Sequence, residues 1–353
     1  MKTIKSSLAT TILSAALLLL RGSAFAQPAE TGAAGAPYPN MPAIAPLGVR
    51  IGQHLDVHES ARGPAIESGK GYRIQDLGSG LYMVTDNVYQ SMFLVYESGV
   101  VVLDAPPSYA QHITTAIREI TDKKITHLVY SHAHIDHIAG TKSLHLDKHA
   151  VIIGHEETGR LLMRANDPDR PIPTVTFKDR YMLKVGSQKL ELSYHGNAHI
   201  PGNIFIYAPA QKTLMVIDIV FPGWMPWRRF ALAQDIPGYF EQVREIYEMK
   251  WEVLVGGHVA RTGSHADVAL QLEFMNDLKA AARQALASTK PGVGLATTDS
   301  GNPWAVFGNY IDRVVIQTVN SLTPKWSTRL AGFDVYIWDQ CYAMEQSLRI
   351  DGF

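Results

Sequence analysis

The feature that most constrains this chain is a cluster of three histidines and one aspartate within six residues. The cluster reads His132-Ala-His134-Ile-Asp136-His137 and directly follows the apolar, strand-like run Ile125–Tyr130. In an extended chain alternate residues face the same side, so His132 and His134 can bind one ion. Asp136 and His137 follow at a turn and can reach a second ion. Imidazole and carboxylate suit zinc, and also iron, manganese and cobalt. The cluster therefore predicts a metal site at the carboxyl end of a strand, where open α/β sheets place their sites.

Three polar residues later in the chain also stand just after apolar, strand-like runs. They are His199, Asp218 and His258, and the runs before them are Leu190–Tyr194, Leu214–Ile217 and Val253–Val255. A carboxylate that ends a buried run, as Asp218 does, is costly without a partner. Because Cys341 is the only cysteine, a multi-thiolate site is excluded and the metal ligands must be His and carboxylate. The three positions therefore predict the remainder of a site for two ions.

Between residues 72 and 264, short apolar runs typical of strands alternate with a few helical segments. Helices are predicted at Tyr109–Thr121 and Tyr239–Met249, and strands outnumber helices in the first half. This order suits an α/β fold in which sheets are covered by helices on their outer faces. We therefore predict a catalytic domain over residues 72–264.

The pattern becomes helical beyond residue 265. Val268–Ala287 and Trp304–Leu322 show helical spacing on either side of a loop rich in Gly and Pro, and Val335–Leu348 is a further apolar stretch. Such spacing is typical of amphipathic helices. We predict a helical C-terminal extension over residues 265–353 that packs on the core.

The N-terminus has the layout of a secretory signal peptide over residues 1–26. Lys2 and Lys5 precede the apolar run Leu8–Leu20, and an A-x-A cleavage motif occupies residues 24–26. The run is short for a membrane span, which needs about 20 residues. We expect the mature protein to begin at Gln27, in the periplasm or secreted, with no attachment to the membrane after cleavage. Retention of the segment as an anchor is the alternative.

Charge and composition narrow the classes of partner. The chain has 32 Lys and Arg against 33 Asp and Glu, a formal net charge of −1. A nucleic-acid-binding protein would need a clustered excess of basic residues, so we expect a small-molecule substrate and no nucleic acid.

Residues 27–71 begin with a stretch rich in Ala, Pro and Gly, which predicts an arm outside the core. The sequence carries no indication of the number of subunits.

These residues resemble the metallo-β-lactamase superfamily, whose pattern is HxHxDH, a later His, a bridging residue and a final His. The resemblance runs over about residues 72–258 and implies an αβ/βα sandwich with the site on one edge. It implies two divalent ions, with zinc as the expected metal, and Asp136 as the residue that positions the attacking water and passes on its proton. The implied ligands of the first ion are His132, His134 and His199. Those of the second ion are Asp136, His137 and His258. Asp218 is implied to bind both ions.

Two nearby histidines compete for the third ligand position of the first ion. The family usually has Pro-Gly shortly after this histidine, and His199 precedes Pro201-Gly202 with that spacing, which favours it over His195. Ala198 stands where the family commonly has Gly, a small departure.

The predicted reaction is hydrolysis of a lactone or simple ester. Asp218 resembles the bridging Asp of lactonases and glyoxalase II-like enzymes, although Phe221 stands where acyl-homoserine lactonases place a Tyr. Hydrolysis of β-lactams is the alternative, because that activity is useful in the periplasm. An iron-dependent oxidoreductase of the same fold, such as a persulfide dioxygenase, is a further alternative. The aromatic segment Phe221–Trp227 either lines an apolar substrate pocket or packs under the extension.

Overall fold

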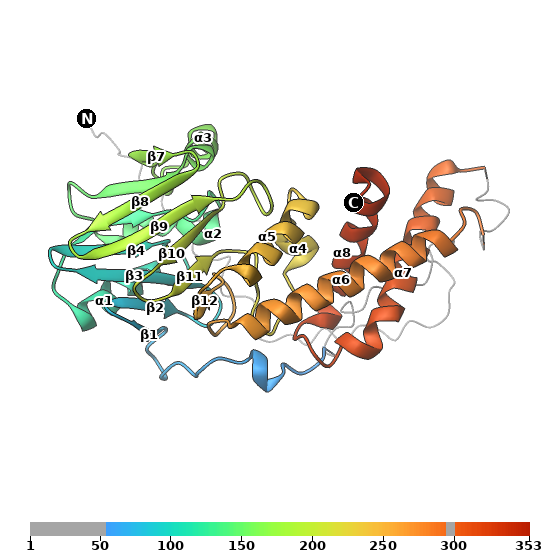
Figure 1. The fold of residues 1–353 in the computed structure, drawn as a ribbon, viewed down its shortest axis with the longest axis horizontal. Helices are drawn as coiled ribbons and strands as arrows, with labels where there is room; N and C mark the ends of the chain where they lie inside the picture. The colour runs from blue at the N-terminus through green and yellow to red at the C-terminus, as the bar shows by residue number, and fades with distance from the viewer. Residues whose placement is uncertain (1–53, 294–300) are drawn as a thin grey trace, which may run out of the picture. The chain divides into compact units, whose positions relative to one another are not determined.

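The computed structural model describes residues 54–293 and 301–353. The predicted signal peptide, residues 1–26, and the first part of the predicted arm, residues 27–53, lie outside the described residues. No helix within the described ranges combines the length and apolarity needed to cross a membrane. Two facing sheets with helices beside them form the core (Figure 1).

The first sheet has seven strands that follow one another in chain order. These strands are β1 (Arg73–Gly78), β2 (Leu81–Thr85), β3 (Gln90–Tyr96), β4 (Gly99–Leu103), β5 (Ile125–Val129), β6 (Val151–His155) and β7 (Val175–Phe177). Strands β1 to β4 pair antiparallel, whereas β4 to β7 pair parallel. Parallel neighbours need crossover connections, which contain α1 (Ala110–Ile120), α2 (Ile135–Ile138) and α3 (Glu156–Ala165).

The second sheet has five strands in the order β12-β11-β10-β9-β8. These are β8 (Arg180–Val185), β9 (Gln188–Tyr194), β10 (Ile204–Ala208), β11 (Thr213–Val216) and β12 (Val253–Val255). Only β11 and β12 pair parallel, and α4 (Arg228–Leu232) and α5 (Ile236–Glu248) lie between them in the chain. Strand β8 has no counterpart among the strands expected from the sequence. It forms the edge of the sheet and half of its residues are exposed, which weakens its apolar pattern.

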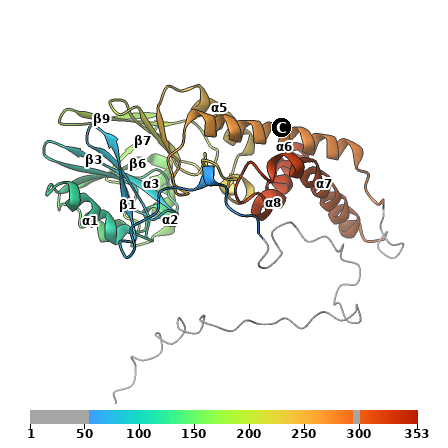
Figure 2. The same cartoon turned by 90° about the horizontal axis from the view of Figure 1, so that it is seen from below.

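Three buried apolar clusters define the layers, which Figure 2 shows from a second side. The central cluster lies between the sheets and includes Met92 and Val101 of the first sheet with Leu192 and Ile206 of the second. A second cluster joins the outer face of the first sheet to α1, and a third joins the second sheet to α5. Burial of each such side chain contributes about 1.5–3 kcal/mol. The layers therefore form the predicted αβ/βα sandwich.

The three helices of the C-terminal extension are α6 (His265–Ser288), α7 (Pro303–Trp326) and α8 (Phe333–Gln346), followed by the short turn η3 (Ser347–Asp351). They confirm the helical extension predicted from the sequence. Helix α6 begins beside β12 and runs away from the sheets toward α7 and α8 (Figures 1 and 2). It starts with a capping box formed by Ser264 and Asp267.

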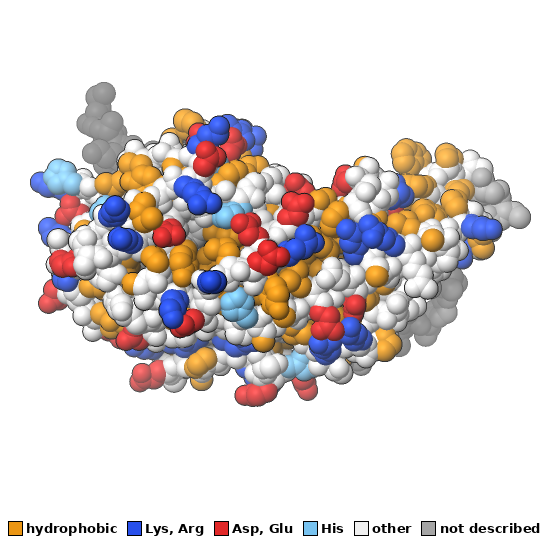
Figure 3. Space-filling view, viewed as in Figure 1, with side chains coloured by type: hydrophobic (Ala, Val, Ile, Leu, Met, Phe, Trp, Pro, Cys, Tyr) orange, Lys and Arg blue, Asp and Glu red, His pale blue; other side chains and the backbone are white. Residues whose placement is uncertain are grey.

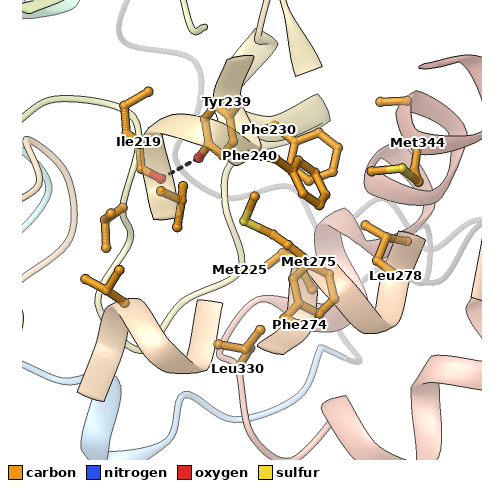
Figure 4. Packing of buried hydrophobic residues seen from close by; sticks show 14 of the residues in the cluster. Ile219, Met225, Phe230, Tyr239, Phe240, Phe274, Met275, Leu278, Leu330 and Met344 are labelled. Carbon is orange, nitrogen blue, oxygen red and sulfur yellow. Dashed lines mark hydrogen bonds between the residues drawn. The ribbon is translucent and has the colours of Figure 1, made fainter. Parts of the chain in front are cut away.

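Apolar side chains join the extension to the core (Figure 4). Met225 and Phe230, from the segment between β11 and α5, belong to the same buried cluster as Phe274 of α6. The Tyr239 hydroxyl of α5 donates a hydrogen bond to the carbonyl oxygen of Ile219 at 2.6 Å, drawn as the dashed line in Figure 4. The segment that follows β11 is thus held between the second sheet and the extension.

The described end of the arm also packs on both parts. It contains the short turn η1 (Glu59–Ala61), and Ala61 is fully buried. The Trp224 indole donates a hydrogen bond to the Ala61 carbonyl oxygen at 3.0 Å. The Leu55 amide donates to Asp334 Oδ2 of α8 at 2.9 Å. Backbone groups of the arm therefore anchor it beside the segment that follows β11.

Charged side chains of both signs are interspersed on the face shown in Figure 3. This face therefore carries no large patch of a single charge, in keeping with the formal net charge of −1.

Candidate metal centre

All seven predicted ligand residues lie in the connections that follow strands, at one edge of the two sheets. His132 and His134 follow β5, and Asp136 and His137 belong to α2. The remaining three follow β9, β11 and β12 and are His199, Asp218 and His258. Because these strand ends meet at one edge, the structure brings the seven side chains into two adjoining groups.

The first group contains three histidines and one aspartate, whose candidate ligand atoms all lie within 4.8 Å of one another. His134 Nδ1 is 2.9 Å from His199 Nε2. Asp218 Oδ2 is 3.1 Å from His199 Nε2 and 3.5 Å from His132 Nε2. His134 keeps an extended backbone at the start of α2, so it faces the same side as His132. Three imidazoles and one carboxylate can surround a single ion.

The second group contains Asp136, His137 and His258. His137 Nε2 is 3.1 Å from His258 Nε2, and Asp136 Oδ2 is 3.4 Å from His137 Nε2. Asp218 also reaches this group, because its Oδ1 is 2.9 Å from His258 Nε2 and its Oδ2 is 3.3 Å from His137 Nε2. Asp218 therefore contacts both groups.

The unpaired buried atoms of the cluster fit a divalent cation. His132 Nε2 and Asp218 Oδ1 are buried and take part in no hydrogen bond among the described residues. Asp218 Oδ1 lies 2.9 Å from His258 Nε2 but forms no hydrogen bond with it. Buried polar groups without partners are costly, and a cation would satisfy both atoms. Ligand nitrogens about 2.0–2.1 Å from a tetrahedral zinc ion lie roughly 3.3 Å apart, close to the spacing of the facing imidazoles.

Burial and charge set the protonation of the cluster. Burial, with the neighbouring His134, holds the pKa of His132 well below its ordinary value. Burial, with His199, lowers the pKa of His134 to about 4. Both rings are therefore neutral at pH 7, as a metal ligand must be.

The pKa values of Asp218 and His137 shift in opposite directions, and both shifts favour the charged form. Burial alone would raise the pKa of Asp218, but His137, His258 and His199 hold it well below its ordinary value. Burial alone would lower the pKa of His137, but Asp218 raises it to about 9. Asp218 is thus an ionised carboxylate whose charge attracts a cation, and the proton on His137 must leave before that ring can bind one.

Two residues to which the sequence analysis gave no role, Ser131 and Asp104, support the ligands. Ser131 Oγ lies 2.9 Å from His132 Nδ1, and the Ser131 amide donates to Asp104 Oδ1 at 2.8 Å. Asp104 is fully buried, and burial raises its pKa to about 6. Asp104 and Asp218 both have φ of 64° at the end of a strand, a left-handed conformation that Asp tolerates better than most residues. An Asp directly after the fully buried strand β4 was the signal for Asp104.

His195, the alternative to His199 in the sequence, lies outside both groups, and so does His127. His195 Nδ1 is 2.7 Å from Glu245 Oε1, and its ring stacks on Phe205 with centroids 4.1 Å apart. His127 lies within β5, where its Nδ1 is 3.0 Å from Thr126 Oγ1. His199, rather than His195, lies beside His134 and Asp218.

A cavity of 810 Å³ opens onto the cluster. Its walls outside the ligands include Tyr89, Phe221, Trp224, Met225, Trp227 and Tyr336. Arg170 is the single cation among the described lining residues. The aromatic segment that follows Asp218 therefore both lines the cavity and packs under the extension, because Met225 also belongs to the buried cluster shared with the extension. The sequence did not indicate that α8 contributes Tyr336 to the cavity.

Comparison with known proteins identifies the fold family. The family model of the metallo-beta-lactamase superfamily matches residues 85–284. The 2,4-dinitroanisole O-demethylase subunit alpha of Nocardioides sp. (strain JS1661) is 25% identical over 187 residues, which cover 51% of this chain and 56% of that protein. The metallo-beta-lactamase type 2 of Elizabethkingia meningoseptica is 26% identical over 164 residues, 43% of this chain and 63% of that protein. The chain thus spans less than two thirds of these relatives.

Solved structures of metallo-β-lactamases also resemble the chain. The enzyme from Pontibacter korlensis has a TM-score of 0.47 and 18% identity, with 57% of this chain and 97% of that chain covered. The DIM-1 enzyme has a TM-score of 0.48 and 18% identity, with 57% and 95% covered. The family model spans more than half of the chain and includes every residue of the His/Asp cluster. The chain therefore belongs to the metallo-β-lactamase superfamily.

Proposed function

We propose that the protein is a dinuclear, metal-dependent hydrolase of lactones or esters that carry an apolar group. One observation carries this proposal: Asp218 contacts both ligand groups and lines a cavity whose other walls are largely apolar. His132, His134 and His199 would hold one ion, and Asp136, His137 and His258 the other. Zinc is the expected metal, and a bound pair of ions supplies Lewis acidity and a nucleophilic water at neutral pH.

Asp136 is the chain's own candidate for proton transfer. Its side chain is 43% exposed, whereas that of Asp218 is 5% exposed. Asp136 therefore faces the cavity and can accept a hydrogen bond from the attacking water, orient it and take its proton. Asp218, buried among imidazoles, can only hold the ligand groups together.

The lining of the cavity favours an apolar substrate over a charged one. Arg170 donates from Nε to Asp167 Oδ2 at 2.7 Å and from Nη1 to the Ala133 carbonyl oxygen at 2.6 Å. Its charge is therefore already paired, and the remaining walls offer little to the carboxylate of a penicillin. One relative is named for 2,4-dinitroanisole, an aromatic substrate, which also supports an apolar ring in the cavity.

Hydrolysis of β-lactams is the second candidate, supported by the metallo-beta-lactamases of Elizabethkingia meningoseptica and Bacillus cereus among the relatives. An iron-dependent oxidoreductase of the same fold is the candidate from another class. Metal content and substrate preference together distinguish the three functions.

The test measures the metal content of the protein as purified, and then the activity of a zinc-loaded preparation on a panel of substrates. We expect close to two ions per chain, and kcat/KM for an apolar lactone or aryl ester at least about tenfold above that for any penicillin or carbapenem, about 1.4 kcal/mol. Faster turnover of β-lactams would establish the second candidate. One iron per chain in the protein as purified, with no hydrolysis of any substrate in the panel, would refute the hydrolase and favour the oxidoreductase.

We also propose that the protein is exported and acts on a small molecule in the periplasm or outside the cell, without nucleic acid or membrane as partner. The support is the signal-like sequence of residues 1–26. Expressed in a Gram-negative host, the protein should be recovered from the periplasm with Gln27 as its first residue. Recovery of the intact chain from the membrane would favour the anchor.

A further inference from the structure

The segment between β11 and α5 contains a turn of unusual hand. Arg229, Phe230, Ala231 and Leu232 have φ values of 50°, 55°, 55° and 56°. Left-handed backbone is unfavourable for residues other than Gly, Asn and Asp, and it normally occurs at single positions rather than in a row. Four consecutive residues of other types therefore need contacts from elsewhere in the fold to hold them in place.

Gln340 of α8 supplies these contacts. Its side chain is fully buried. Its Nε2 donates hydrogen bonds to the carbonyl oxygens of Pro226 at 2.6 Å and of Trp227 at 3.0 Å, and its Oε1 accepts from the Phe230 amide at 2.8 Å. One amide side chain thus binds the backbone on both sides of the point where the chain enters the left-handed turn.

Neighbouring contacts strengthen this attachment. Asp339 Oδ2, from the residue before Gln340, lies 3.2 Å from Arg228 Nη1. Phe230 is fully buried in the cluster that also contains Met344 of α8, and both are labelled in Figure 4. The turn is therefore fixed to α8 through its backbone, a charged side chain and an apolar side chain.

The turn and α8 together form one wall of the cavity. Trp227, Ala231 and Leu232 line it, and so does Tyr336. We call these four residues the far wall. Tyr336 precedes Gln340 by four residues, so the two side chains lie on the same side of α8. The helix thus contributes one part of the far wall directly and holds the other part in position.

We propose that α8 is the substrate-recognition element of this site. Gln340 is a positioning residue that holds the left-handed turn, and the far wall contacts an uncharged, ring-bearing group of the substrate. The chemical class follows from the wall, because none of its four side chains is charged. The adjacent cations, Arg228 and Arg229, lie 3.2 Å and 4.0 Å from the Asp339 carboxylate. This proposal rests on the proposed function, in which the metal cluster acts on a substrate in the same cavity.

The test compares two acetates that share the reacting group and differ only in a phenyl ring: 2-phenylethyl acetate and ethyl acetate. Binding is measured separately by calorimetry with 4-phenyl-2-butanone, a ketone of matching shape that cannot be hydrolysed. The variants are Tyr336→Leu, which removes the ring, and Gln340→Met, which removes all three hydrogen bonds at similar volume. Gln346→Met on the same helix is the matched control, because among the described residues its amide donates to the Tyr342 hydroxyl alone, at 2.8 Å.

We expect Tyr336→Leu and Gln340→Met each to raise the Kd of 4-phenyl-2-butanone at least fivefold. Each should also lower the ratio of kcat/KM for 2-phenylethyl acetate to that for ethyl acetate at least fivefold, whereas Gln346→Met should change neither. A folded Gln340→Met variant with unchanged Kd and ratio, or equal effects from Gln346→Met, would overturn the proposal. If Gln340→Met does not fold, an unchanged Kd and ratio in Tyr336→Leu would overturn it.

The two proposals fail in different ways. Wild-type protein that hydrolyses neither acetate, yet binds the ketone with the expected loss in both variants, would refute the ester hydrolase and support the recognition element. Wild-type protein that hydrolyses esters but does not bind the ketone would refute the recognition element alone.

Discussion

The cavity has two sides that are built in different ways. One side, which we call the ligand side, consists of the seven candidate metal ligands. These residues follow strands, and their chemistry is evident from their type, as with His132 and Asp218. The far wall instead depends on a left-handed backbone and on a glutamine 110 positions along the chain from the turn that it holds. The first side provides the chemistry and the second shapes the space, so substitutions on the two sides should have separable effects.

The two sides also differ in how they tolerate strain. Asp104 and Asp218 adopt left-handed conformations singly, and Asp accepts this at small cost. The turn that carries part of the far wall instead has four consecutive residues in that conformation, Arg229 to Leu232, and α8 holds this turn in place. Loosening the extension should therefore alter selectivity before it alters metal binding.

The largest effect is expected from Asp218→Ala, which removes the one carboxylate that contacts both ligand groups. Both ions should be lost or held weakly, and kcat/KM should fall at least about 1000-fold, about 4 kcal/mol of transition-state stabilisation. Metal analysis after dialysis and steady-state kinetics measure the two effects. Asp169→Ala is the matched control, because its side chain is 58% exposed and pairs with Lys142 on the surface. Retention of two ions by Asp218→Ala would contradict the bridging role.

A smaller effect distinguishes the two neighbouring histidines. His199→Ala should lower kcat/KM at least about 100-fold and reduce metal content, because its Nε2 lies among the first ligand group. His195→Ala should keep its metal, since that ring pairs with Glu245 and stacks on Phe205. Metal analysis of both variants checks this. The opposite pattern would assign the ligand position to His195.

Much of the fold and of the ligand side could be predicted from the sequence, for a physical reason. Imidazoles and carboxylates that directly follow apolar strands are explained most simply as metal ligands, and strand ends at one sheet edge bring them together. The helical spacing of Val268–Ala287 and Trp304–Leu322 likewise predicted α6 and α7 to within a few residues.

The far wall could not be predicted in the same way. Nothing in the type of Gln340 indicates that it binds a distant backbone, and Arg229 and Leu232 do not favour a left-handed turn. The half-exposed edge strand β8 lacks a strong apolar pattern. The far wall depends on contacts between segments far apart in the chain, which local residue patterns do not record. Strand β8 pairs with the adjacent β9, and its weak pattern reflects exposure at the edge of the sheet.

The smallest effect is expected where the extension begins, and it sharpens the separation between the two sides. Asp267 in the first turn of α6 accepts hydrogen bonds from Arg261 Nη2 at 2.6 Å and Nη1 at 3.0 Å, and from the Ser264 amide at 2.8 Å. Burial alone would raise the pKa of Asp267, but the hydrogen bonds from Arg261 and Ser264 lower it below its ordinary value. Ionised Asp267 therefore stabilises the fold above the unfolded-state pKa of about 3.9, and this stabilisation is lost as the pH falls through and below that value.

Asp267→Asn should accordingly lower the free energy of unfolding by about 1–2 kcal/mol at pH 7, since hydrogen bonds to a charged group are lost. The difference from wild type should shrink toward pH 3, where the carboxylate begins to take up a proton. Urea unfolding at the two pH values measures this, and metal content at pH 7 should not change. Glu252→Gln, beside the start of β12, is the control: its carboxylate is 65% exposed and pairs with the exposed Lys212, so the substitution should cost less than about 0.5 kcal/mol. A difference for Asp267→Asn that is equal at both pH values would mean that the shape of the cap, and not its charge, holds the extension to the core.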